Sequence, residues 1–245
     1  MKYVKRFLVV IAALAVLAAA AFVGWAEMSL GPSAQALAAL QSDQQVAVTG
    51  GDWITFRPVD ARPVTGFIFY PGGRVDYRSY APLLRLIAAR GYLVVVPRVL
   101  LNLAFFSPDA AAPIIAAHPE IKHWAVGGHS LGGVAAAMFV SNHPGQAQGI
   151  AFWASYPGDN RLLKSGVKIV SISASNDGLA TREKIDASRP LLPAGTVFVS
   201  IPGGDHAQFG SYGPQPGDNP ASISAQAQWT QVAAATVSLL ESLGK

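Results

Sequence analysis

The chain has 245 residues and carries 18 Lys and Arg against 14 Asp and Glu, which gives a formal net charge of +4. Hydrophobic residues make up 51% of the chain and charged residues only 13%. An intrinsically disordered protein is excluded, because disorder requires low hydrophobicity together with high net charge. The length suits one α/β domain or two small domains. Cysteine is absent, which excludes disulfides, thiolate metal sites and cysteine nucleophiles.

Much of the positive charge lies at the amino end. Lys2, Lys5 and Arg6 precede the first acidic residue, Glu27. The rest of the chain is therefore nearly neutral, which argues against a nucleic-acid-binding protein.

The segment Phe7–Trp25 is apolar at every position except Gly24. At ~1.5 Å per residue, a helix of this length just spans the hydrocarbon core of a bilayer. Cations precede it and none follows until Arg57, which predicts a cytoplasmic N-terminus and an exported body. We expect a single-pass membrane anchor with an extracytoplasmic domain. The alternative is a signal peptide, cleaved near the small residues Ala18–Ala20, and a secreted protein.

We divide the chain into an anchor or signal segment (1–28), a tether (29–45) and a catalytic domain (46–245). Along the domain, short apolar strands alternate with amphipathic helices. The strands are expected at 46–49, 53–56, 65–70, 92–96, 124–127, 149–153, 167–173 and 196–201, and the helices at 80–90, 109–117, 131–142, 180–188 and 222–243.

This alternation predicts an α/β fold with a mostly parallel central sheet of about seven to eight strands and helices on both faces. In such sheets, ligands bind beyond the carboxyl ends of the strands. Candidate catalytic residues should therefore follow strands directly.

Ser130 lies in Gly128-His129-Ser130-Leu131-Gly132, which fits the pattern G-x-S-x-G. A strand precedes the motif and a helix follows it, as a nucleophile elbow requires. The glycines two residues before and after the serine leave room for the strand and helix to approach each other. The alternative is a glycine-rich turn whose serine only caps the helix.

A serine nucleophile needs a histidine base that a carboxylate orients. Of the five histidines, only His206 follows a strand near the C-terminus. Asp177 directly follows an earlier strand and is the favoured acid, although it could also cap the next helix. Asp159 is the rival acid, whereas Asp205 is a poor orienting group because neighbouring side chains diverge.

Acyl transfer also needs N–H donors for the developing oxyanion. The residue after the nucleophile, Leu131, supplies one backbone N–H. The second donor is expected in Pro71-Gly72-Gly73-Arg74, with Gly73 favoured and Arg74 as the alternative. A simple type II turn would explain the same glycines.

With these residues placed, the chain resembles the α/β-hydrolase superfamily over roughly residues 46–243. More narrowly, it is similar to small, lidless, membrane-anchored bacterial hydrolases of the fold-5 type. The resemblance rests on the segments FYPGGRVDYRSYAPL, GGHSLGG, FWASYP, SNDGLAT and GGDHAQFGSYGPQPGD, in that order. It implies serine-dependent hydrolysis of an ester or related acyl bond, with no cofactor and no metal. Pro71 stands where many relatives carry histidine, which leaves the second oxyanion donor less defined.

Only about 20 residues separate the strand 149–153 from Asp177, where a lid domain would normally be inserted. We therefore expect an open site suited to small or surface-presented acyl substrates. Arg74, Trp153 and Tyr156 are candidate substrate-binding residues, and Phe105 and Phe106 are candidate lining residues. Alternatives are a thioesterase, lactonase or peptidase with the same triad, or a non-catalytic membrane-tethered binding module. The sequence leaves the oligomeric state open.

Overall fold

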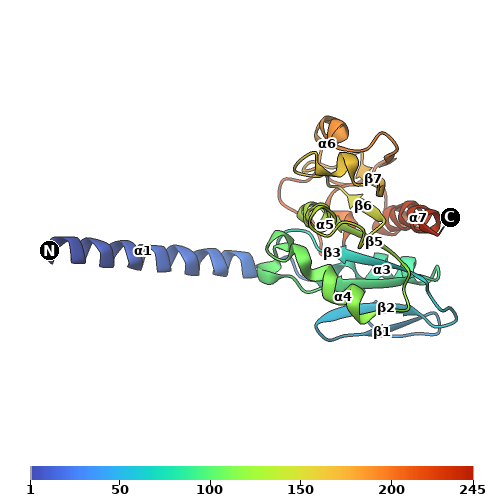
Figure 1. The fold of residues 1–245 in the computed structure, drawn as a ribbon, viewed down its shortest axis with the longest axis horizontal. Coiled ribbons are helices and arrows are strands. Elements are labelled where there is room, and N and C mark those ends of the chain that lie inside the picture. The colour runs from blue at the N-terminus through green and yellow to red at the C-terminus, as the bar shows by residue number, and fades with distance from the viewer. Residues whose placement is uncertain (1, 245) are drawn as a thin grey trace.

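The computed structural model describes residues 2–244, which form one α/β domain with a long helix projecting from it (Figure 1). The projecting helix is α1 (Lys2–Glu27). It is long and apolar enough to cross a membrane, and the side chains of its apolar part are exposed rather than buried in the domain. These are properties of a membrane anchor and of a signal sequence alike.

The domain is built on one eight-stranded sheet with the order β1-β2-β4-β3-β5-β6-β7-β8. β2 pairs antiparallel with β1 and β4, and the remaining neighbours pair in parallel. The strands are β1 (Val46–Thr49), β2 (Trp53–Pro58), β3 (Thr65–Tyr70), β4 (Leu93–Pro97), β5 (His123–His129), β6 (Gly149–Trp153), β7 (Lys168–Ala174) and β8 (Val197–Ile201). The predicted mostly parallel sheet is confirmed.

Helices cover both faces of this sheet. The helices of the domain are α3 (Ala81–Ala88), α4 (Ala111–Ala117), α5 (Leu131–Asn142), α6 (Arg182–Ser188) and α7 (Ala225–Leu243). α3 and α7 pack over one face and α4 and α5 over the other. β3 shows why the strands are apolar throughout: Phe67 and Phe69 enter one core, while Ile68 and Tyr70 enter the other.

The segment expected to be a tether lies against the domain. It contains the short helix α2 (Ala34–Ala38), whose Ala36 is fully buried. Ser33 bonds to Ser211 through both its backbone N–H (2.8 Å) and its hydroxyl (2.7 Å). Burial of small apolar residues such as Ala36 accounts for the packing of this segment against the domain.

Candidate active site

The strand-to-helix turn around Ser130 joins β5 to α5. Ser130 has a φ of 52°, a backbone conformation that L-residues rarely adopt. A Cβ on Gly128 would come within 2.3 Å of the Gly132 carbonyl carbon, and one on Gly132 within 2.2 Å of the Tyr70 oxygen. Both positions therefore require glycine, for the steric reason expected from the motif. The turn holds Ser130 at the carboxyl end of the sheet, half exposed.

Asp177 and His206 meet at the same end of the sheet. Asp177 follows β7 and His206 follows β8, and Asp177 Oδ2 lies 2.8 Å from His206 Nδ1. Both side chains are almost completely buried. Asp177 Oδ1 also accepts from the N–H groups of Leu179 (2.7 Å) and Ala180 (2.6 Å). The carboxylate thus contacts the histidine ring and accepts from the turn that precedes α6, whose own N-cap is Thr181 rather than Asp177.

Ser130 and His206 line one cavity of about 230 Å³. The other lining residues are Leu131, Val134, Ala154, Ser155, Tyr156, Leu179 and Ala180. His206 Nε2 is buried and makes no hydrogen bond within residues 2–244. Because Nδ1 faces the Asp177 carboxylate, Nε2 is the nitrogen left to exchange a proton with a group in the cavity.

Two backbone N–H groups lie next to this cavity without an acceptor. Neither Gly73 nor Leu131 donates its backbone N–H to any group of the described chain. A Cβ on Gly73 would lie 3.1 Å from the Leu131 side chain, so the two residues are adjacent. Arg74, the alternative donor, gives its N–H to the Asn102 carbonyl at 2.7 Å. The geometry therefore favours Gly73 as the second oxyanion donor.

The candidate substrate-binding residues divide into one that lines the cavity and others that lie elsewhere. Tyr156 lines it. Trp153 is fully buried in the core, with its ring 4.3 Å from that of Phe69 (centroid to centroid), and its Nε1–H donates to Thr236. Arg74 points away, with its guanidinium 4.3 Å from the centre of the Trp25 ring. The geometry thus supports Tyr156 and not Trp153 or Arg74.

Phe105 and Phe106 also lie outside the cavity. They are exposed on the segment between β4 and α4. The rival acids lie elsewhere too: Asp159 pairs with Arg161 on the surface. Asp205 accepts from the N–H groups of Gln208 and Ala221, not from His206.

A buried chain of hydrogen bonds behind the site escaped the sequence analysis. Gly72 N–H donates to the Tyr80 hydroxyl (2.9 Å), which lies 3.0 Å from His129 Nδ1. Burial, and then the neighbouring His206, lower the pKa of His129 well below its usual value, so the ring is neutral. Because the Tyr80 oxygen accepts from Gly72, its O–H group can donate to His129, and the chain of bonds links the loop after β3 to the turn around Ser130.

Asp218 is a second residue that the sequence analysis did not single out. One of its carboxylate oxygens accepts from Gly178 N–H (2.9 Å) and the other from Ala207 N–H (2.8 Å). These are the residues directly after Asp177 and His206, so Asp218 holds the loops that carry Asp177 and His206 together. The only sequence signal was its position in the Gly- and Pro-rich loop after His206.

Metal-binding side chains do not gather in the described part of the chain: no three His, Asp or Glu residues form a possible metal site there. The residues that converge at the carboxyl end of the sheet are instead a hydroxyl, an imidazole and a carboxylate. This set is suited to nucleophilic attack assisted by a base.

Comparison with known proteins identifies the family that the sequence matches. The sequence pattern of the Alpha/beta hydrolase family matches residues 66–230. No curated protein matches the chain.

Solved structures share the fold at low sequence identity. A CIB-like hydrolase from Thermoplasma acidophilum has a TM-score of 0.61 at 13% identity, over 81% of this chain and 98% of that one. The esterase domain of a Rhodothermus marinus protein has a TM-score of 0.57 at 14% identity, covering 80% and 97%. A putative dienelactone hydrolase from Klebsiella pneumoniae has a TM-score of 0.55 at 17% identity, covering 75% and 91%.

Proposed function

This chain belongs to the alpha/beta hydrolase family, and from that membership we propose that it is a serine hydrolase that cleaves an ester or related acyl bond. Ser130 is the nucleophile, His206 the general base and Asp177 the group that orients the histidine. The Gly73 and Leu131 N–H groups bind the oxyanion. The family supports hydrolysis in general, and the more specific assignment rests on the site.

The observation that carries the proposal is the position of the His206 ring. Its Nδ1 is held by Asp177 at 2.8 Å, and its Nε2 has no partner within residues 2–244. The same ring lines the cavity that Ser130 lines. No hydrogen bond joins Ser130 to Nε2 here, and such catalytic bonds often form only when substrate binds.

The proposed reaction has two steps. In the first, Ser130 Oγ attacks the acyl carbon while its proton passes to His206 Nε2, and the Gly73 and Leu131 N–H groups bind the oxyanion. The C–O bond to the leaving alcohol then breaks, and that alcohol takes the proton from Nε2. In the second step, water gives a proton to Nε2 and attacks the acyl carbon. The bond from that carbon to Ser130 Oγ then breaks, Nε2 returns the proton to Oγ, and the acid is released.

Labelling with a fluorophosphonate probe tests this proposal. The wild-type protein should be labelled, while Ser130→Ala should lose all labelling and His206→Ala nearly all. Ser238→Ala is the control and should keep full labelling, because Ser238 is exposed on α7 and its hydroxyl bonds only to the Ala234 carbonyl. Labelling that survives Ser130→Ala would reject Ser130 as the nucleophile. An unlabelled, folded wild type would instead favour a tethered binding module without turnover.

For location, we propose that α1 is retained as a membrane anchor with the catalytic domain outside the cytoplasm. The uninterrupted apolar length of α1 and the preceding cations support this orientation. The intact mass of the protein in the membrane fraction tests it. A mature chain that begins near Ala21 would contradict retention.

A further inference from the structure

The segment between β4 and α4 divides its apolar side chains between the core and the surface. Leu103 and Ala104 are buried against the domain, whereas Leu100, Phe105 and Phe106 are 61%, 36% and 44% exposed. We call Leu100–Phe106 the apolar loop. Exposed large apolar groups that cluster on a loop require an explanation beyond core packing.

The apolar loop lies against the carboxyl end of α1. The Phe106 and Phe22 rings meet edge to face, with their centres 6.2 Å apart. Phe22 in turn lies 5.8 Å from Trp25, and Phe106 lies 4.1 Å from Phe105. These four aromatic rings form a continuous row that crosses from the helix to the loop.

Hydrogen bonds fix the apolar loop in this position. Leu101 and Asn102 both have positive φ angles (55° and 52°), which a loose surface loop would avoid. Asn102 accepts from Arg74 N–H through its carbonyl, and its side-chain amide contacts the Ala26 carbonyl at 3.4 Å. The depth of the loop relative to α1 is therefore set by the fold.

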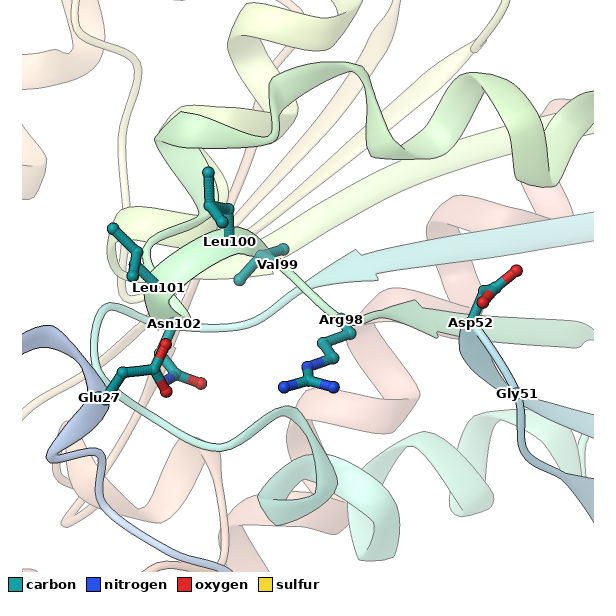
Figure 2. Close-up of a pocket in the computed structure, with 8 residues that line it drawn as sticks. All are labelled: Glu27, Gly51, Asp52, Arg98, Val99, Leu100, Leu101 and Asn102. Carbon is teal, nitrogen blue, oxygen red and sulfur yellow. The ribbon is translucent and has the colours of Figure 1, made fainter. Parts of the chain in front are cut away.

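Charged side chains beside the apolar loop indicate the depth at which this part of the chain lies in a bilayer. Glu27, Asp52 and Arg98 line a cavity of about 450 Å³ beside the apolar loop. In Figure 2, Arg98 points into the space between Glu27 and Asp52, and Leu100 and Leu101 point away from it. Because charged groups are costly in hydrocarbon, this cavity belongs at the headgroup level. Phe22 precedes Glu27 by more than one helical turn and lies deeper.

We propose that the apolar loop inserts Leu100, Phe105 and Phe106 into the interface of the bilayer that α1 crosses. The contact between Phe106 and Phe22 places the loop at the depth where the apolar part of α1 ends, and aromatic rings favour that zone. The occupant of this surface is therefore lipid. The inference rests on the proposed retention of α1 and is independent of the proposed chemistry.

Spin labels on single cysteines test the insertion in the full-length chain, because the natural sequence contains no cysteine. Phe105→Cys and Leu100→Cys probe the loop, and Ala15→Cys reports whether α1 crosses the bilayer. Val64→Cys is the matched control: Val64 is 52% exposed and precedes β3, at the opposite end of the sheet. Labelled proteins are reconstituted into phosphatidylcholine vesicles, and collision rates with oxygen and with a water-soluble nickel chelate are compared. Cooperative thermal unfolding confirms that each variant is folded.

The expected ratio of oxygen to nickel collisions at Phe105 and Leu100 is several-fold higher than at Val64 and lower than at Ala15. Loop labels that match Val64 while Ala15 remains immersed would overturn the insertion and leave the anchor intact. A water-exposed label at Ala15 would overturn the anchor and, with it, the insertion. None of these outcomes depends on whether Ser130 is the nucleophile.

Discussion

At the scale of single residues, the site depends on two imidazole rings packed against each other. The His129 and His206 ring centres lie 4.4 Å apart, and each ring has one nitrogen bound: His206 Nδ1 by Asp177 and His129 Nδ1 by Tyr80. The partners differ in charge. A carboxylate stabilises a protonated ring, whereas a buried hydroxyl does not. His206 thus faces a carboxylate, while His129, which faces the Tyr80 hydroxyl, stays neutral.

Replacing Asp177 with Asn tests whether the carboxylate orients His206. The Asn oxygen still accepts from Leu179 and Ala180, so its NH₂ group faces His206 Nδ1. That nitrogen must then accept, and the proton moves to Nε2, where it blocks general-base action. We expect kcat to fall by about 10³- to 10⁴-fold with little change in KM. Steady-state hydrolysis of a p-nitrophenyl ester measures this, and Asp159→Asn, at the surface, should retain wild-type activity.

The neutral state of His129 predicts how stability varies with pH. Its folded pKa is below the unfolded value of about 6.5, so only the unfolded chain binds a proton as the pH falls below that value. This difference in proton binding does not affect stability above about pH 6.5. Below that pH it lowers the free energy of unfolding by up to about 1.4 kcal/mol for each pH unit. His129→Asn keeps an acceptor for Tyr80 but does not titrate in this range.

Thermal unfolding between pH 5 and 7.5 measures this effect. His129→Asn should lose less stability on acidification than the wild type does. His143→Asn is the control, because His143 is partly exposed and pairs with Asp109 at the surface. Parallel pH profiles for wild type and His129→Asn would contradict the assignment of a neutral buried ring.

At the scale of elements, the loop after β3 that carries Gly73 is held by the segment that follows α1. Leu30 N–H donates to the Arg74 carbonyl (2.7 Å), and its own carbonyl accepts from Asp76 N–H (3.0 Å). The Arg74 guanidinium donates to the Met28 carbonyl and stacks on Trp25. Arg74 keeps a positive φ of 56°, which these contacts must offset. The residue directly before Arg74 is Gly73, the proposed oxyanion donor.

The Arg74 side chain points away from the cavity, but we expect Arg74→Ala to weaken catalysis through the position of Gly73. Alanine meets the same backbone strain but loses the contacts to Trp25 and Met28, so Gly73 is less well positioned. We expect kcat to fall by about 10- to 100-fold while KM changes little. Arg78→Ala is the matched control, because Arg78 pairs with Asp76 at the surface. Unchanged kcat in a folded Arg74→Ala protein would show that the stacking on Trp25 does not position the loop.

The strands and the larger helices of the domain could be predicted to within about three residues, whereas the short helix α2 was not expected. Strands such as β3 and β6 are short apolar runs with turn residues at their ends, and α5 begins directly after the elbow. The proximity of Asp177 and His206 followed from topology, since the carboxyl ends of neighbouring parallel strands share one edge.

The direction of individual side chains could not be predicted in the same way. Trp153 ends a strand that is buried on both faces, so no polar alternation marks which side meets the cavity. The direction of Arg74 depends on Trp25 and Met28, which are distant in sequence. The pairing of Tyr80 with His129 depends on how α3 and β5 pack, which sequence spacing does not encode.

At the scale of the whole molecule, the proposed anchor and the proposed catalytic site are neighbours. α1 ends beside the loop that carries Gly73, and the apolar loop packs Leu103 behind the same glycine. Between β6 and Asp177, the chain forms only β7 and a short 3-10 helix, Arg161–Lys164, with no inserted domain. No lid is therefore inserted at this point of the described chain, and the cavity's volume of about 230 Å³ limits which acyl groups it holds.

This architecture predicts a preference for short acyl chains. A long chain would leave the small cavity and extend into water, where added methylenes contribute no binding. In a series of p-nitrophenyl esters, kcat/KM should be highest for acetate to butyrate and at least about tenfold lower for decanoate. Tyr156→Ala removes part of the cavity wall, which enlarges the cavity and should shift the optimum to longer acyl chains. Leu163→Ala is the control: Leu163 is exposed and lies outside the cavity, so the optimum should not change. A wild-type optimum at decanoate would mean that a deeper acyl site opens on binding.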